Sequence, residues 1–174
     1  MLILITGGSK NGKSALAEKI ITSSNGKRVY VACMQPFGDE AHAAIERHRE
    51  IRRDKCFETV EKYTDIHELE LEKNCCALLE CLGNLCANEM FSCYEKDPVS
   101  KIAAGIKKLS DKASLFVVVT SEVGDDGVLY SPETMEYVKA LGELNRTIAK
   151  EADCVIEAVF GLPYVLKGEL PPCF

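Results

Sequence analysis

Five short apolar runs recur along the chain and alternate with segments that have the composition of helices. The runs lie at Leu2–Thr6, Arg28–Cys33, Cys75–Cys81, Ser114–Thr120 and Cys154–Phe160. Each run is almost continuously apolar and rich in Leu or β-branched residues, instead of alternating with polar residues. This pattern is typical of strands that are covered on both faces, as in a parallel sheet.

The helical segments fall between these runs. We expect helices at Ala15–Ile21, Asp39–Arg53, Lys101–Lys112 and Pro132–Lys150. Strands that alternate with helices predict an α/β fold, with a mostly parallel central sheet flanked by helices. No linker, repeat or change of composition divides the chain, so we expect one domain over residues 1–174.

Charge and hydropathy exclude some classes of function. A net charge of −6 argues against nucleic acid as the main partner, because phosphate neutralisation needs a basic face. No apolar run approaches the roughly 18 residues of a membrane span. The chain enters its first strand without a basic segment or an export signal, so we expect a cytoplasmic location.

The chain contains nine cysteines, which is a high number for its length. No two of them are separated by two residues, so the spacing fits neither a zinc site nor an iron–sulfur site. Cys75, Cys76, Cys81 and Cys154 lie in the apolar runs, where a thiol behaves as a small core residue. We expect reduced cysteines in a reducing compartment.

A phosphate-binding motif follows the first apolar run directly. The pattern G-x-x-x-x-G-K-[ST] is matched in every fixed position, between an expected strand and an expected helix. Backbone N–H groups of such a loop surround phosphate oxygens, and the start of the helix adds positive charge. We therefore expect Lys13 to contact the β- and γ-phosphates of a nucleoside triphosphate, and the Ser14 hydroxyl to bind Mg²⁺. The loop consists of Gly7, Gly8, Ser9, Lys10, Asn11, Gly12, Lys13 and Ser14.

Two glutamates stand at the ends of expected strands, where α/β proteins place their active sites. Glu80 ends the third run, which we expect to neighbour the strand of the phosphate loop. A carboxylate there can help to hold Mg²⁺ or accept hydrogen bonds from a base or ribose. Glu122 occupies the comparable place after the fourth run. For both residues the alternative is a solvated carboxylate at the end of a strand.

A strongly basic segment, Arg47–Lys55, holds five cations and a histidine within nine residues of an acidic protein. In a helix, Ile45, His48 and Arg52 share one face. Nearby cations favour a neutral imidazole at His48. Such an imidazole can attack a phosphorus centre while arginines neutralise the phosphate charge. The alternative is a solvated basic face with an incidental histidine.

With this basic segment beside the phosphate loop, the chain resembles the bifunctional adenosylcobinamide kinase/adenosylcobinamide-phosphate guanylyltransferase family of cobalamin assembly. The resemblance runs nearly from end to end. Its most specific part is R-H-R-x-x-R, followed by T-x-E and L-[DE]-C. The matching segments are Ile5–Ser14, Tyr30–Gln35, Asp39–Glu40, Arg47–Arg52, Thr59–Glu61, Leu79–Leu82, Thr120–Gly124 and Gly161–Pro163.

The resemblance implies a P-loop NTPase fold of the RecA-like type and two reactions. A nucleoside triphosphate, ATP or GTP, phosphorylates adenosylcobinamide with Mg²⁺, and GMP is then transferred from GTP through a guanylyl-histidine. His48 matches the guanylylated histidine, and the family further implies a homotrimer. The family positions that contact the guanine nucleotide are matched by Ala32, Cys33, Met34, Arg49, Glu50, Ile51, Arg52, Glu61 and Glu80.

The chain departs from the family pattern at three places that bear on the corrinoid substrate. The turn after Glu122 has an extra residue and no proline, Tyr137-Val138 replaces an Arg-Asp pair, and Phe57 stands nearest to an absent tryptophan. These departures keep alternatives open. One is a P-loop small-molecule kinase with a single activity or another acceptor, and the other is a nucleotide-dependent switch module.

Overall fold

The structure, a computed structural model, describes residues 1–124, 127–171 and 173; within its helices, the side chains at positions 40, 41, 44, 48 and 51 lie outside the description. The strands are β1 (Leu2–Thr6), β2 (Arg28–Ala32), β3 (Phe57–Glu61), β4 (Cys76–Glu80), β5 (Leu115–Val119), β6 (Cys154–Val159) and β7 (Leu162–Lys167). The helices are α1 (Lys13–Ser23), α2 (Gly38–Arg52), α3 (Leu82–Phe91), α4 (Pro98–Lys112) and α5 (Pro132–Glu151), with short 3-10 turns η1 (Arg53–Lys55) and η2 (Ile66–Glu68).

These strands form one sheet in the order β3-β2-β4-β5-β1-β6-β7. Every neighbouring pair is parallel except β6 and β7, which form an antiparallel hairpin. The predicted α/β fold with a mostly parallel sheet is therefore confirmed.

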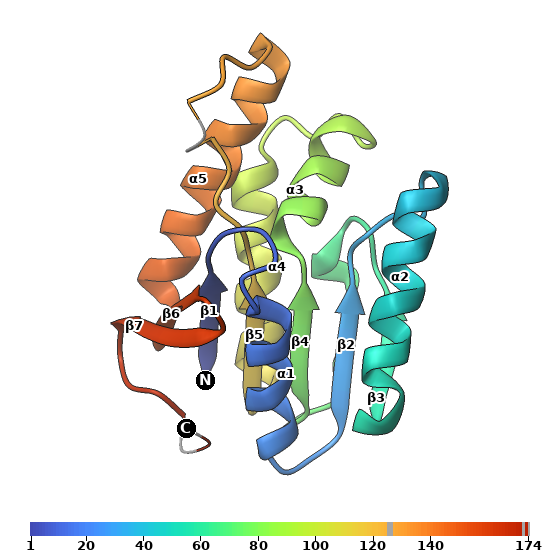
Figure 1. Cartoon of the computed structure of the whole chain (residues 1–174), viewed down its shortest axis with the longest axis vertical. Helices are drawn as coiled ribbons and strands as arrows, with labels where there is room; N and C mark the ends of the chain where they lie inside the picture. Colours follow the sequence, from blue (N-terminus) through green and yellow to red (C-terminus); the bar gives the residue numbers. More distant parts are fainter. Residues whose placement is uncertain (125–126, 172, 174) are drawn as a thin grey trace.

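Helices cover both faces of the sheet, with α1 in front of it and α3, α4 and α5 behind it (Figure 1). The side chains of Leu16, Ile20 and Ile21 carry α1 into one buried cluster with strand residues. Residues of α3, α4 and α5 fill a larger cluster on the other face. Helix α2 stands at the flank of the sheet beside β2 and β3 (Figure 1).

Three elements, β3, β7 and α3, have no counterpart among the elements predicted from apolar runs. Both strands lie at the edges of the sheet, and several of their side chains are exposed, so neither strand forms a continuous apolar run. Helix α3 follows β4 after one residue, and its N-cap is the sulfur of Cys81, which accepts a hydrogen bond from the Asn84 N–H at 3.4 Å. A cysteine cap is not one of the usual sequence signals of a helix start.

The sheet order also changes the expected surroundings of Glu80. We expected its strand to lie beside the strand of the phosphate loop, but β5 separates β4 from β1. The carboxyl ends of β1, β5, β4 and β2 nevertheless meet at one edge of the sheet, because all four strands are parallel. The functional groups at these ends are thus brought together across strand β5.

All nine cysteines are free thiols. Cys75, Cys76 and Cys154 are buried as expected, whereas the prediction for Cys81 was wrong: it is partly exposed because it follows the last residue of β4. Among the described residues, no group of His, Cys, Asp and Glu has the arrangement of a metal site. In the same part of the chain, every helix is too short or too polar to cross a membrane.

Candidate active site

The phosphate loop is seated on the turn of the β6–β7 hairpin. Gly7 and Gly12 have φ angles of 134° and 87°, which favour glycine. A Cβ at Gly7 would lie 2.6 Å from the carbonyl oxygen of Ala158, and one at Gly12 would lie 3.1 Å from the Cα of Gly161. The Gly161 N–H donates to the Asn11 carbonyl at 3.1 Å. The loop is therefore held in shape by backbone contacts on its far side.

Lys13 extends across this loop. Its ammonium donates to the carbonyl oxygens of Gly7 at 2.8 Å and of Gly8 at 2.6 Å. Burial lowers the pKa of Lys13, and nearby groups that include Glu80 and Glu122 act in the opposite direction. The amine thus stands at the loop before any phosphate is bound.

Glu80 joins the phosphate loop to the strand β2. The Ser14 hydroxyl donates to its Oε1 atom, and the Tyr30 hydroxyl donates to its Oε2 atom at 3.0 Å. Burial and the charge of Glu80 raise the pKa of Tyr30 well above its usual range, so Tyr30 remains a neutral donor. A serine hydroxyl beside a carboxylate at the start of α1 is an oxygen donor set that suits Mg²⁺.

A cavity in front of Ser14 and Glu80, the phosphate cavity, opens above the loop with a volume of about 610 Å³. Five of its side chains are charged, and one of them is Arg47 of α2. Its lining consists of Ser9, Lys10, Lys13, Ser14, Arg47, Glu80, Cys81, Val119, Thr120, Ser121, Glu122 and Val123.

A second cavity, the α2 cavity, lies between α2 and the ends of β2, β3 and β4. It shares Glu80 and Cys81 with the phosphate cavity, so the two cavities adjoin at the end of β4. Its lining consists of Tyr30, Ala32, Met34, Ile45, Arg49, Arg52, Thr59, Glu61, Tyr63, Glu80, Cys81 and Asn84.

Arg52 is the only charged side chain of α2, among those described, that is buried. Its guanidinium lies 3.4 Å from the centre of the Tyr30 ring, in a cation–π contact. Its Nε and Nη1 atoms are buried, and the described part of the chain offers them no hydrogen-bond acceptor. Buried donors of this kind are rarely left unpaired in native proteins, and Arg52 lines the α2 cavity, where a bound ligand or water can supply the acceptor.

Glu61, the last residue of β3, is held in the lining of the α2 cavity by two hydrogen bonds. The Arg49 guanidinium donates to its Oε1 at 2.9 Å, and the Tyr63 hydroxyl donates to its Oε2 at 2.7 Å. Arg49 also pairs with Glu46 at 2.7 Å. The cavity thus combines a fixed carboxylate with two arginines, which suits a ligand with both N–H donors and phosphate oxygens.

The linings of the two cavities include most of the predicted site residues, but not all of them. The Cys33 side chain is fully buried in the core, and its carbonyl accepts a hydrogen bond from Asn88 at 2.9 Å. Glu50 is exposed and pairs with Arg53 at 2.9 Å, away from the cavity lining. The side chains of His48 and Ile51 lie outside the described part of the chain, although their backbones belong to α2.

The sequence analysis does not mention the lining residues Tyr63 and Asn84, and it includes Tyr30 and Cys81 in matching segments without assigning them to the site. Tyr30 lies within an apolar run and has the pattern of a core residue. Asn84 lies in the first turn of the unpredicted helix α3, four residues after Glu80. The position two residues after the T-x-E motif could have drawn attention to Tyr63.

Comparison with known proteins identifies the family of the chain. Residues 3–166 match the family described as cobinamide kinase / cobinamide phosphate guanyltransferase. The bifunctional adenosylcobalamin biosynthesis protein CobU of Escherichia coli K12 is 31% identical over 96% of this chain and all of its own length. The corresponding protein CobP of Pseudomonas aeruginosa is 30% identical over 95% of this chain and 97% of its own length. CobU of Salmonella typhimurium is 29% identical over 96% of this chain. The chain therefore belongs to the cobinamide kinase / cobinamide phosphate guanyltransferase family.

Proposed function

We propose that this chain catalyses both reactions of its family. In the first reaction, a nucleoside triphosphate phosphorylates the hydroxyl of adenosylcobinamide. In the second, GMP passes from GTP to adenosylcobinamide phosphate, which gives adenosylcobinamide-GDP. The observation that carries the proposal is the junction of a phosphate-binding cavity with an arginine-lined cavity at Glu80.

In this proposal the phosphate loop serves both reactions. Residues Gly7 to Ser14 hold the triphosphate of ATP or GTP through their N–H groups and through Lys13. When phosphoryl transfer takes place, Lys13 neutralises the charge on the γ-phosphate. When GMP is transferred, the same ammonium stabilises the departing pyrophosphate.

We assign Mg²⁺ to the oxygen atoms of Ser14 and Glu80, which already contact each other. When bound, the ion neutralises charge on the phosphate oxygens. Tyr30 keeps Glu80 oriented toward Ser14 through its hydrogen bond to the second carboxylate oxygen.

We assign the guanylyl transfer to His48 on α2. An imidazole nitrogen attacks the α-phosphorus of GTP, an N–P bond forms, and pyrophosphate leaves. The phosphate of the acceptor then attacks the same phosphorus and releases the histidine. The arrangement of α2 supports this assignment, because Arg47 lines the phosphate cavity while Arg49 and Arg52 line the α2 cavity.

We assign the guanine nucleotide to the α2 cavity. The unpaired N–H groups of Arg52 and the fixed carboxylate of Glu61 are the groups that support this assignment most directly. Ala32, Met34 and Arg49 complete the lining on the β2 and α2 sides. Cys33, Glu50 and Ile51 remain proposed nucleotide contacts from the family pattern alone.

The proposal treats residues 1–174 as one catalytic domain that acts on small molecules. The nine free cysteines suit a reducing cytoplasm, where we place the reactions. The homotrimer implied by the family also belongs to this proposal.

Mass spectrometry of the intact protein tests the proposal. After incubation with GTP and Mg²⁺, we expect one guanylyl group on His48, and we expect release of that group when adenosylcobinamide phosphate is added. His48→Ala should carry no adduct. His42→Ala is the matched control, because His42 is an exposed histidine on the same helix, and it should be labelled like the wild type.

Two outcomes would contradict the proposal. Full labelling of His48→Ala would exclude the guanylyl-histidine. Phosphorylation of adenosylcobinamide by a protein that never forms an adduct would indicate a simple kinase.

A further inference from the structure

We infer that Glu122 is the general base of the kinase reaction, the group that removes the proton from the acceptor hydroxyl. This inference rests on the proposed function, and it concerns a residue outside the predicted nucleotide contacts. The positions of Glu122, of the charges around it and of its backbone carry the argument.

Glu122 stands at the centre of the catalytic edge of the sheet. It follows β5, the strand that lies between β1 and β4. Its Oε1 accepts a hydrogen bond from the Thr6 hydroxyl at 3.1 Å. Thr6 is the last residue of β1 and directly precedes the phosphate loop. The carboxylate is therefore anchored beside the loop through one of its oxygens.

The charges that line the phosphate cavity are Lys10, Lys13 and Arg47, which are cations, and Glu80 and Glu122, which are anions. A carboxylate near a triphosphate weakens its binding through like-charge repulsion, so phosphate binding alone does not account for Glu122. The charge of Glu122 acts on Lys13 and opposes the lowering of its pKa by burial. Because Glu122 lines the same cavity as Lys13, its carboxylate can reach a group that approaches the γ-phosphate.

The two carboxylates of the cavity have different surroundings. Glu80 receives hydrogen bonds from Ser14 and Tyr30 on its two oxygens, and this arrangement suits a carboxylate on the metal side of the site. Glu122 is held by Thr6 at one oxygen, and its side chain is exposed toward the cavity. This division leaves Glu122 as the carboxylate suited to receive a proton.

The backbone that carries Glu122 is fixed from behind by helix α5. The Thr120 hydroxyl donates to Asn145 Oδ1 at 2.7 Å, and Asn145 Nδ2 donates to the Ser121 carbonyl at 3.4 Å. Thr120 is fully buried. These contacts connect the two residues before Glu122 to helix α5, so we regard Asn145 as a positioning residue for the base.

The proposed step balances in atoms and charge. The acceptor hydroxyl oxygen forms a bond to the γ-phosphorus, and the bond from that phosphorus to the β–γ bridging oxygen breaks. The nucleoside diphosphate leaves with that oxygen, and the hydroxyl proton passes to the Glu122 carboxylate. Proton removal by a positioned carboxylate contributes about 10²- to 10⁴-fold to a rate.

The test compares Glu122→Gln with Glu136→Gln, a control at an exposed glutamate in α5 outside both cavities. Each variant is assayed for phosphorylation of adenosylcobinamide by ATP and for the GMP adduct formed from GTP. We expect kcat of Glu122→Gln to fall by about 10²-fold or more. Its KM for ATP should not rise above the wild-type value, because the substitution removes a charge that repels phosphate. Its GMP adduct should still form, since Glu122 takes no part in the guanylyl transfer. Glu136→Gln should match the wild type in every assay.

A second variant guards against a folding defect. Glu122→Asp retains a carboxylate and should recover part of the lost kcat. Glu122→Gln with wild-type kcat, or with kinase and adduct lost together, would overturn the role of Glu122 and leave the proposed function intact. A wild-type protein that does not phosphorylate adenosylcobinamide would overturn both.

Discussion

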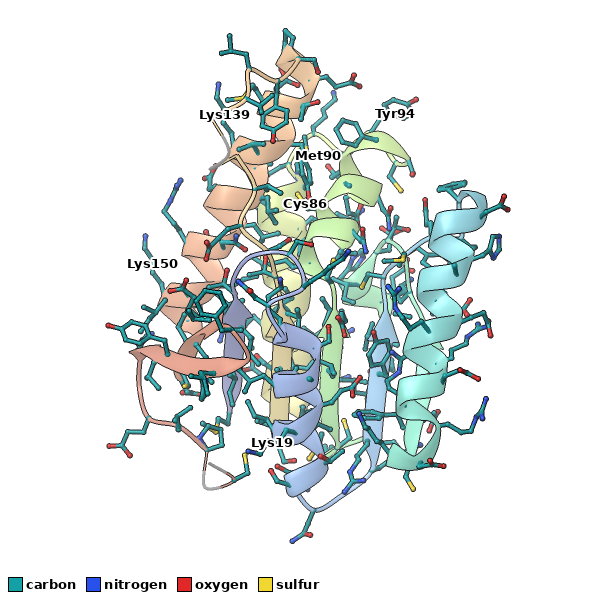
Figure 2. All side chains as sticks on the ribbon, viewed as in Figure 1. Lys19, Cys86, Met90, Tyr94, Lys139 and Lys150 are labelled. Atoms are coloured by element: carbon teal, nitrogen blue, oxygen red, sulfur yellow. The ribbon has the colours of Figure 1, made fainter. Side chains whose placement is uncertain are left out.

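Helices α1 and α2 both reach the candidate site, but the chain holds them by different means. Helix α1 buries Leu16, Ala17, Ile20 and Ile21 against the sheet. Among the described side chains of α2, only Arg52 is buried. Figure 2 shows side chains that project from α2 on the side away from the sheet.

The energies of these contacts differ in the same direction. A fully buried Ile or Leu side chain stabilises a fold by about 1.5–3 kcal/mol. Helix α2 is held by the buried cation–π contact of Arg52, worth about 2 kcal/mol when desolvated, and by the exposed Arg49–Glu61 ion pair, worth about 1 kcal/mol or less. The phosphate loop and α1 are therefore preformed. Helix α2, which carries His48, can move relative to the sheet at a low cost in free energy. Three predictions test this contrast.

The largest expected effect comes from replacing a glycine by alanine in the phosphate loop and, for comparison, at the start of α2. Gly7→Ala combines a φ of 134° with a Cβ that would lie 2.6 Å from a backbone oxygen. We expect it to lower the free energy of unfolding by about 3 kcal/mol, from backbone strain and overpacking together. Gly38→Ala at the start of α2 has a φ of 74° and open space around it, so it should cost about 1 kcal/mol. Urea unfolding measures the change in the free energy of unfolding for each variant. Equal costs would show that the loop adapts as easily as α2.

How much of this contrast the sequence predicts depends on which interactions create it. The phosphate loop is predictable because its chemistry is local: glycines, a lysine and a serine at fixed spacing between a strand and a helix. The buried strands are predictable for the same reason, since their apolar runs are continuous.

The α2 cavity depends on contacts between residues far apart in the chain, and a local sequence pattern does not predict such contacts. Tyr30 has the pattern of a core residue, yet its ring supports Arg52 and its hydroxyl binds Glu80. Edge strand β3 escapes the apolar pattern although it carries Glu61. The family resemblance identifies Glu61 and Arg52 but gives no reason for their proximity, which depends on the sheet order.

Hydrogen exchange tests the contrast without any substitution. Backbone amides in the second half of α1 should exchange at least about 100-fold more slowly than those in the middle of α2, because opening α1 exposes buried apolar surface. Addition of GTP and Mg²⁺ should slow exchange in α2 more than in α1, since the ligand adds contacts where the free protein has few. The measurement is exchange followed by mass spectrometry of peptides. Equal protection of the two helices in the free protein would contradict the contrast.

The smallest expected effect concerns two neighbouring arginines of the basic segment. Arg52 is buried over Tyr30, and two of its nitrogen atoms have no hydrogen-bond acceptor among the described residues, whereas Arg53 is exposed and pairs with Glu50. Arg52→Ala should slow formation of the GMP adduct by about 10- to 100-fold, the effect of one lost charged hydrogen-bonding group. Phosphorylation of adenosylcobinamide by ATP should change less than threefold, because Arg52 does not line the phosphate cavity.

Arg53→Ala is the matched control, and it should leave both reactions near the wild-type rate because an exposed ion pair contributes little. Arg52→Lys separates charge from shape. A lysine keeps the positive charge but loses the planar group that lies on the Tyr30 ring, so it should recover only part of the lost rate. Equal losses of both reactions in Arg52→Ala would mean that the two cavities work as one rigid unit. In that case the different packing of α1 and α2 would not correspond to a separation between phosphorylation and GMP transfer.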